Sequence, residues 1–131
     1  MAQRPLVAIV DDDKSIRTAT SDLLKAAGFA AAAFEDAESF LGWPTRASVA
    51  CLVADMRMPG MSGLELYEAL VAAGDAIPTI IITAHPEELT QARARAVGIC
   101  CYLSKPFAPD ELLECVGQAL ARSGGGPIPK S

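Results

Sequence analysis

The chain has 131 residues, of which 51% are hydrophobic and 21% are charged, and its formal net charge at pH 7 is −5. This length argues for a single domain, and the composition provides a packed core and excludes wholesale disorder. The acidic balance argues against nucleic-acid binding, and no apolar run approaches the roughly 18 residues of a membrane span. The N-terminal segment lacks a signal-peptide pattern, so we expect a cytoplasmic domain that contacts neither membrane nor nucleic acid.

Five short apolar runs recur along the chain, and each has the length of a strand. Nearly all of their residues are apolar, which is typical of strands buried on both faces of a parallel sheet. The second run contains four alanines at 30–33, so propensity alone does not separate strand from helix there, and its place in the alternation favours a strand. The predicted strands are 6–10, 29–34, 49–54, 79–82 and 99–103.

The segments after these runs repeat their apolar residues with the period of a helix. Gly28 stands where a C-terminal cap belongs, Ser62 and Glu65 fit a capping box, and Pro86 begins an acidic first turn. The predicted helices are 14–27, a short one from 37 to about 43, one from 63 to about 73, 86–97 and one that begins at 109. Their predicted buried faces include Ile16, Ala19, Leu23, Leu24 and Ala27 in the first helix, Leu64, Tyr67, Leu70 and Val71 in the third, and Leu112, Cys115, Val116, Ala119 and Leu120 in the last.

The alternation of five strands with five helices predicts an α/β fold, a doubly wound five-stranded parallel sheet with helices on both faces. Right-handed crossovers restrict the topology, and the flavodoxin-like strand order 2-1-3-4-5 is the common solution. We expect one domain over residues 1–122 and a flexible glycine-rich tail or linker at 123–131. The four cysteines form no C-x-x-C pair, so we expect small buried side chains in a reducing compartment, with a redox role as the alternative.

Polar and charged side chains stand where the predicted strands end. Asp11 and Asp12 follow the first strand, Asp55 the third and Thr83 the fourth, and Lys105 comes shortly after the fifth. Ligand sites of open α/β sheets lie beyond the carboxyl ends of the strands, so we expect these residues to converge. Crowded carboxylates need a cation, and a hard oxygen cluster suits Mg²⁺. With an ammonium and a hydroxyl nearby, such a site would stabilise phosphoryl transfer onto a carboxylate. The third acid of the first cluster, Asp13, is expected to cap the first helix.

Four segments carry a family resemblance. They are VDD at 10–12, DMRMPGMSG at 55–63, ITA at 82–84 and YLSKPF at 102–107. With these segments in this order, residues 5 to about 121 resemble the receiver domains of two-component response regulators, the CheY-like superfamily. The Arg-Met-Pro loop is similar to that of receivers of the FixJ and NarL type, which in many relatives precede a helix-turn-helix output domain.

The resemblance implies a phosphoryl-accepting signalling domain with Asp55 as the phosphoacceptor. By the same resemblance, Mg²⁺ is held by Asp11, Asp12, Asp55 and the backbone carbonyl of Arg57, and the phosphoryl group is contacted by Thr83 and Lys105. Tyr102 is the implied aromatic switch that turns inward when Thr83 moves, and the Lys105–Pro106 bond is expected to be cis.

The implied partners are a sensor histidine kinase or a phosphotransfer protein as donor and a downstream protein target or fused output domain as receiver of the signal. The signal would pass through the face made by the fourth helix, the fifth strand and the fifth helix. The domain would catalyse only its own phosphorylation and dephosphorylation, so it is not expected to be an enzyme for other substrates. A phosphorylation-dependent homodimer stays open.

Several residues have a plainer reading. Arg57 and His85 flank the site as modulators of the phosphoryl lifetime or are surface residues, and Tyr102 is either the switch or a surface aromatic. A phosphatase with an aspartyl nucleophile would carry a second aspartate where this chain has Arg57. A flavodoxin-like carrier would need a Ser/Thr-rich loop where this chain has three aspartates, and an unphosphorylated scaffold would not need all the site residues.

Overall fold

A computed structural model describes residues 4–123 of the chain. Its single sheet is entirely parallel, and the strand order is β2-β1-β3-β4-β5. The strands are β1 Leu6–Val10, β2 Ala30–Phe34, β3 Cys51–Asp55, β4 Thr79–Thr83 and β5 Cys101–Ser104. The doubly wound, flavodoxin-like fold and its predicted strand order are therefore confirmed.

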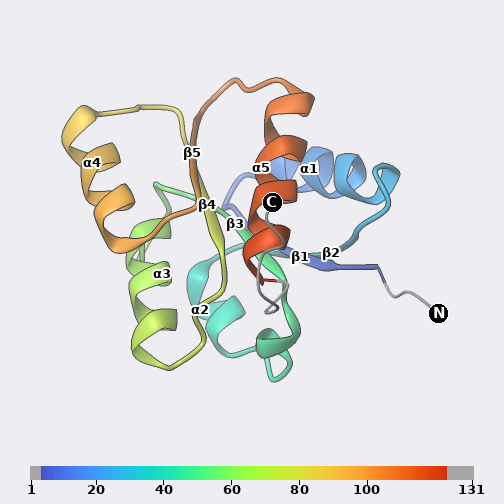
Figure 1. The fold of residues 1–131 in the computed structure, drawn as a ribbon, viewed down its shortest axis with the longest axis horizontal. Coiled ribbons are helices and arrows are strands. Elements are labelled where there is room, and N and C mark those ends of the chain that lie inside the picture. Colours follow the sequence, from blue (N-terminus) through green and yellow to red (C-terminus); the bar gives the residue numbers. More distant parts are fainter. Residues whose placement is uncertain (1–3, 124–131) are drawn as a thin grey trace.

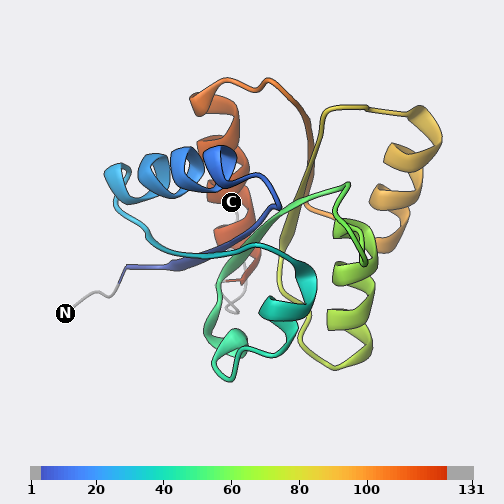
Figure 2. The same ribbon diagram turned by 180° about the vertical axis from the view of Figure 1, so that it is seen from behind.

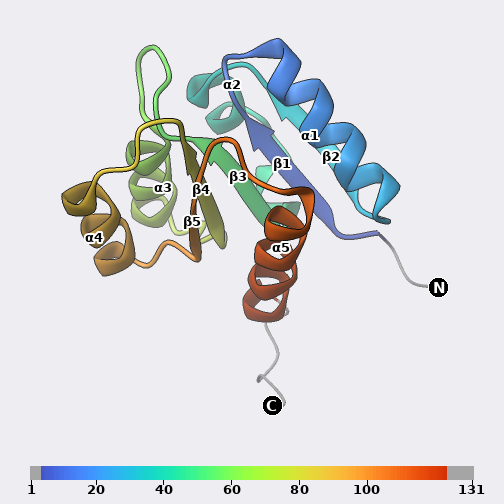
Figure 3. The ribbon, with the colours of Figure 1, turned by 90° about the horizontal axis from the view of Figure 1, so that it is seen from above.

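Helices cover both faces of the sheet. They are α1 Lys14–Ala26, α2 Ala37–Leu41, α3 Gly63–Ala72, α4 Glu88–Val97 and α5 Pro109–Ser123, with a short 3-10 helix at Arg46–Ser48. Helices α1 and α5 lie on one face, and α2, α3 and α4 lie on the other (Figures 1 and 3). Seen from behind, α2 and α3 stand next to each other (Figure 2).

The two faces hold separate hydrophobic cores because side chains alternate along each strand. Val7 and Ile9 of β1 join the core under α1 and α5, and Ala8 and Val10 join the core under α2, α3 and α4. All four side chains are buried. The sheet is thus covered on both sides, which holds the carboxyl ends of its strands in fixed positions at one edge.

The predicted buried faces of α1 and α3 were wrong in detail. Helix α1 buries Thr20, whereas Ala19 is exposed, because the residues that meet the sheet are spaced four apart, as Thr20 and Leu24 are. In α3, Leu66 is buried, and Val71 is 45% exposed since it points away from the buried row. The predicted core position Ala27 is exposed as well, and it lies just beyond α1 as the C-cap residue.

The start of α4 differs as well. Pro86 does not open the helix, because Glu87 after it has an extended backbone (φ −127°, ψ 137°) and serves as the N-cap. The helix therefore begins at Glu88. Elsewhere the signals hold: Ser62 and Glu65 form a full capping box at α3, and Gly28 has a φ of 101° just after α1.

The cysteines behave as apolar side chains. Cys51 and Cys115 are buried in the core under α1 and α5, Cys100 and Cys101 pack against it, and all four are free thiols. Burial raises the pKa of the Cys51 thiol to about 12, which keeps it protonated. Among the described residues, no helix is long and apolar enough to cross a membrane. The predicted tail lies outside them from residue 124 onward.

Candidate functional site

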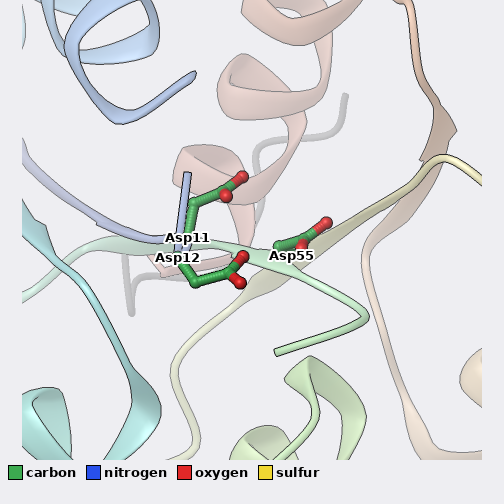
Figure 4. A group of neighbouring side chains, drawn as sticks. All are labelled: Asp11, Asp12 and Asp55. Carbon is green, nitrogen blue, oxygen red and sulfur yellow. The ribbon is translucent and has the colours of Figure 1, made fainter. Parts of the chain in front are cut away.

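Three carboxylates converge at the carboxyl edge of the sheet. Val10 of β1 pairs with Ala54 of β3, which places Asp11 and Asp55 side by side as the chains leave the sheet. Carboxylate oxygens of Asp11, Asp12 and Asp55 all lie within 4.8 Å of one another. Figure 4 shows the three side chains directed into the same space. The convergence predicted from the strand ends is confirmed.

The three acids differ in exposure. Asp11 is 3% exposed and Asp55 is 7% exposed, whereas Asp12 lies on the solvent side. Asp13 does not join them, because its carboxylate accepts hydrogen bonds from the backbone N–H groups of Ser15 (2.8 Å) and Ile16 (3.3 Å) and so caps α1. The cluster is therefore buried at its base and open toward Asp12.

Lys105 brings the one ammonium group of the site. Its Nζ lies 3.1 Å from Asp55 Oδ1 and 3.4 Å from Asp11 Oδ2, and the Lys105–Pro106 peptide bond that follows is cis, as expected. Burial alone would lower the pKa of Lys105, but its hydrogen bond to Asp55 and the charges of both carboxylates hold that pKa above its usual value. Lys105 therefore stays charged and tied to both buried acids.

The carboxylates outnumber the ammonium. Burial, and next the negative charge of Asp11, raise the pKa of Asp55, although Lys105 opposes this rise. Since one lysine does not balance three carboxylates, the cluster favours a further cation. Closely spaced carboxylate oxygens with one side open to water are the donor set that Mg²⁺ prefers, so the residues present fit that ion.

Thr83 stands at the same edge. It is the last residue of β4, 1% exposed, and its neighbour Ile82 pairs with Asp55 across the sheet. Its Oγ1 accepts a hydrogen bond from the backbone N–H of His85 at 3.0 Å. The hydroxyl proton is therefore free to be donated to an oxygen placed beside Asp55.

A cavity of about 560 Å³ lies beside the acidic cluster, between the loop after β3 and the start of α4. Arg57, His85 and Tyr102 all line it. Arg57 forms an ion pair with Glu87 at 3.8 Å, and both side chains are 62% exposed. The Tyr102 hydroxyl is buried with no hydrogen-bond partner in the described part of the chain, although the Glu87 backbone is close, and burial raises its pKa. These three residues therefore meet at a neighbouring cavity.

Two residues of the site escaped the sequence reasoning. Arg17 of α1 donates a hydrogen bond from Nη1 to the backbone carbonyl of Asp11 at 2.7 Å. Gly63 begins α3 directly against the sheet, and a Cβ there would stand only 2.6 Å from the carbonyl oxygen of Asp55. For Gly63 the capping box marked the helix start, but no signal along the chain reveals either tertiary contact.

A protein-family model supports the resemblance. Residues 7–117 match the response regulator receiver domain model, which is most of the chain. The chain is 32% identical over 123 residues to the transcriptional regulatory protein FixJ of Bradyrhizobium diazoefficiens. That match covers 94% of this chain but only 60% of the relative, so the chain spans little more than half the length of that regulator.

Solved structures agree in fold. The low-resolution structure of the response regulator StyR is 43% identical with a TM-score of 0.85, and the match covers 93% of this chain and 62% of that one. The crystal structure of FixJ-N is 33% identical with a TM-score of 0.81, and it covers 96% of this chain and 98% of that one. The similarity thus extends over nearly the whole of both chains in this second case.

Proposed function

This chain belongs to the response regulator receiver domain family, and we propose that Asp55 is its phosphoacceptor. Phosphorylation and magnesium binding are features of that family. The observation that carries the proposal is the setting of Asp55, whose Oδ1 lies 3.1 Å from the Lys105 ammonium while two other carboxylates lie within 4.8 Å. Asp11 is also buried beside Lys105, but its Oδ1 already accepts a hydrogen bond from the Asp13 N–H and its Oδ2 lies farther from the ammonium, at 3.4 Å.

The proposed Mg²⁺ ligands are the carboxylates of Asp11, Asp12 and Asp55 and the backbone carbonyl of Arg57. Bound there, Mg²⁺ would offset the charge of the carboxylates and of the phosphoryl oxygens. Burial and the charge of Asp11 raise the pKa of Asp55, so a cation beside this carboxylate would stabilise its ionised form. Asp12, which is exposed, leaves the site open on the side where a donor would approach.

The proposed reaction moves a phosphoryl group from a donor histidine to Asp55. An Asp55 carboxylate oxygen attacks the phosphorus in line, the new O–P bond forms, and the P–N bond to the imidazole breaks. The departing imidazole takes up a proton. Lys105 pairs with one phosphoryl oxygen and Thr83 donates its hydroxyl proton to another, so both stabilise charge that develops away from the carboxylate. Water later attacks the acyl phosphate, which releases inorganic phosphate and restores Asp55.

Phosphorylation would change the charge at Asp55 enough to move its neighbours. The phosphoryl group carries about −1.5 to −2 charges at neutral pH. Thr83 is drawn toward it, and Tyr102 turns inward into the space that Thr83 leaves, which biases the face formed by α4, β5 and α5. The place of Tyr102 supports this role, since its side chain lines the cavity of about 560 Å³ beside the site.

The proposed donor is a sensor histidine kinase or a phosphotransfer protein. The output is a protein target or an output domain in the same polypeptide, since the chain spans 60% of the FixJ regulator that it resembles. Arg57 and His85, which line the cavity beside the site, are proposed to modulate the lifetime of the acyl phosphate. His85→Ala should change the half-life of the phosphorylated form, and an unchanged half-life would remove His85 from this role.

A phosphorylation assay tests the proposed function. The protein is incubated with acetyl phosphate and Mg²⁺, and incorporation is followed by intact mass. We expect one acid-labile phosphoryl group on the wild type and none after Mg²⁺ is removed by chelation. Asp55→Asn should abolish uptake. Asp13→Asn is the matched control, because asparagine still caps a helix and Asp13 lies outside the cluster, so uptake should persist.

Two results would contradict the proposal. Undiminished uptake by Asp55→Asn would show that another group is the nucleophile. Equal uptake with and without Mg²⁺ would show that the acidic cluster works without the cation. A size measurement with beryllofluoride and Mg²⁺ then tests the phosphorylation-dependent homodimer, which predicts an increase in mass that Asp55→Asn lacks.

A further inference from the structure

Helix α1 is tied to the acidic cluster by a residue that the proposed chemistry does not use. Arg17, in the first half of α1, donates its Nη1 hydrogen to the carbonyl oxygen of Asp11 at 2.7 Å, and its side chain is half-buried. A hydrogen bond from a charged donor is roughly twice as strong as a neutral one. The bond therefore holds the peptide group that links Asp11 to Asp12.

The orientation of the Asp12 side chain depends on this peptide group, because the side chain makes few contacts of its own. The Asp11 N–H donates to the Phe34 carbonyl at 3.1 Å, and Asp11 Oδ1 accepts from the Asp13 N–H at 2.9 Å. Asp11 is thus fixed on several sides. Asp12 is exposed, and its side chain has no hydrogen bond or ion pair in the described part of the chain. The backbone therefore keeps its carboxylate close to Asp55, and of the bonds that hold this backbone, the one from Arg17 is the one made to the Asp11–Asp12 peptide group itself.

We propose that Arg17 is a positioning residue of the cation site: it fixes the Asp11–Asp12 peptide so that the Asp12 carboxylate faces Asp55. This inference rests on the proposed Mg²⁺ function of the cluster. A plain charge effect would have the opposite sign. Removing a cation near three carboxylates strengthens their attraction for Mg²⁺, whereas losing a positioning contact weakens binding, commonly by 10- to 100-fold for groups that orient metal ligands.

Calorimetric titration of Mg²⁺ into the unphosphorylated protein separates the two effects. Arg17→Met keeps the length of the side chain but removes the donor and the charge, and we expect the Kd for Mg²⁺ to rise about tenfold. Lys14→Met is the matched control. It removes the same charge from the same helix, and Lys14 is exposed with no hydrogen bond or ion pair among the described residues. Its Kd should stay within about twofold of wild type or fall.

A second readout needs no metal. The Asp13 N–H is held by Asp11 Oδ1, so its hydrogen exchange in the metal-free protein reports whether the turn is ordered. Arg17→Met should accelerate this exchange at least several-fold, and Lys14→Met should not. Arg17→Lys, which keeps a charged donor, should recover part of the loss in both measurements, and it carries the test if Arg17→Met does not fold.

The outcomes are distinct. Tighter or unchanged Mg²⁺ binding by Arg17→Met, with normal binding by the wild type, overturns the role of Arg17 and leaves the proposed function intact. Unchanged exchange at Asp13 overturns it as well. A wild type that binds no Mg²⁺ overturns the proposed cation site, and the role of Arg17 with it.

Discussion

Helices α1 and α4 both begin beside the acidic edge of the sheet, yet they are attached to it very differently. Helix α1 starts with a side-chain cap from Asp13, is tied to the first strand's end through Arg17, and buries Thr20 and Leu24. Helix α4 starts at Glu88, its N-cap residue Glu87 makes no side-chain cap bond, and it buries only Ala94. The start of α4 is therefore much more loosely held than the start of α1.

The packing around α4 also indicates that its start is loosely held. Its N-terminal end borders the cavity of about 560 Å³, and another cavity of about 250 Å³ lies between its C-terminal half, β5 and α5. Its C-terminal end is better held, since Gly98 has a left-handed φ of 107° and accepts a hydrogen bond from the Tyr67 hydroxyl at 3.4 Å. Elements with few buried contacts open most easily. The contrast agrees with the proposed switch, in which α1 holds the site and the start of α4 responds to it.

Core truncation gives the largest contrast between the helices. Leu24→Ala in α1 removes a fully buried side chain and should lower the free energy of unfolding by about 3 kcal/mol. Leu89→Ala in α4 removes a side chain that is 87% exposed and should change it by less than about 0.5 kcal/mol. Urea unfolding measures both. Similar losses would show that α4 is packed as firmly as α1.

Removal of the N-cap residues should have a smaller effect. Asp13→Ala removes two hydrogen bonds to the first turn of α1 and should cost about 1 kcal/mol. Glu87→Ala removes no cap bond, only exposed contacts to Arg57 and Thr90, so it should cost a few tenths of a kcal/mol. Thermal unfolding of the two variants checks the difference. A larger loss for Glu87→Ala would mean that the start of α4 is anchored.

The pH dependence of the folding stability tests the acidic cluster itself. Because the pKa of Asp55 is raised in the folded state, its protonated form favours folding, and that contribution is lost as the pH rises through the raised pKa. Without Mg²⁺, Asp55→Asn should therefore be slightly more stable than wild type at pH 7, by about 1 kcal/mol or a few degrees in Tm. The difference should shrink at acidic pH.

Addition of Mg²⁺ should make the wild type more stable than Asp55→Asn at pH 7, because the cation stabilises only the chain with an ionised Asp55. Tm measured against pH, with and without Mg²⁺, gives both comparisons. If Asp55→Asn were less stable than wild type at pH 7 in the absence of Mg²⁺, the charges of the cluster would already be balanced in the metal-free protein.

Sequence reasoning succeeded where one local pattern decides the outcome. Continuous apolar runs predicted the strands, and the position of Asp11, Asp12, Asp55 and Lys105 after those runs predicted their convergence, because parallel strands share a carboxyl edge. It failed where the packing angle of a helix decides. The alternative between Ala19 and Thr20 on α1 is of this kind.

Tertiary contacts were also beyond the sequence. The bond from Arg17 to a backbone carbonyl and the close approach of Gly63 to Asp55 depend on how α1 and α3 meet the sheet, which no spacing encodes. At α4, Pro86 gave a helix-start signal that the extended backbone of Glu87 overrides. This misplaced start falls on a helix whose N-cap residue makes no side-chain hydrogen bond to the first turn.

Chemical mapping of the phosphorylated residue tests the central proposal most directly. The protein is phosphorylated with acetyl phosphate and Mg²⁺ and reduced with borohydride, which converts an aspartyl phosphate to homoserine, and the peptides are sequenced by mass spectrometry. We expect homoserine at position 55 and unmodified aspartate at 11 and 12. Homoserine at either of those positions, or aspartate retained at 55 in protein that carries the phosphoryl group, would contradict the assignment of Asp55.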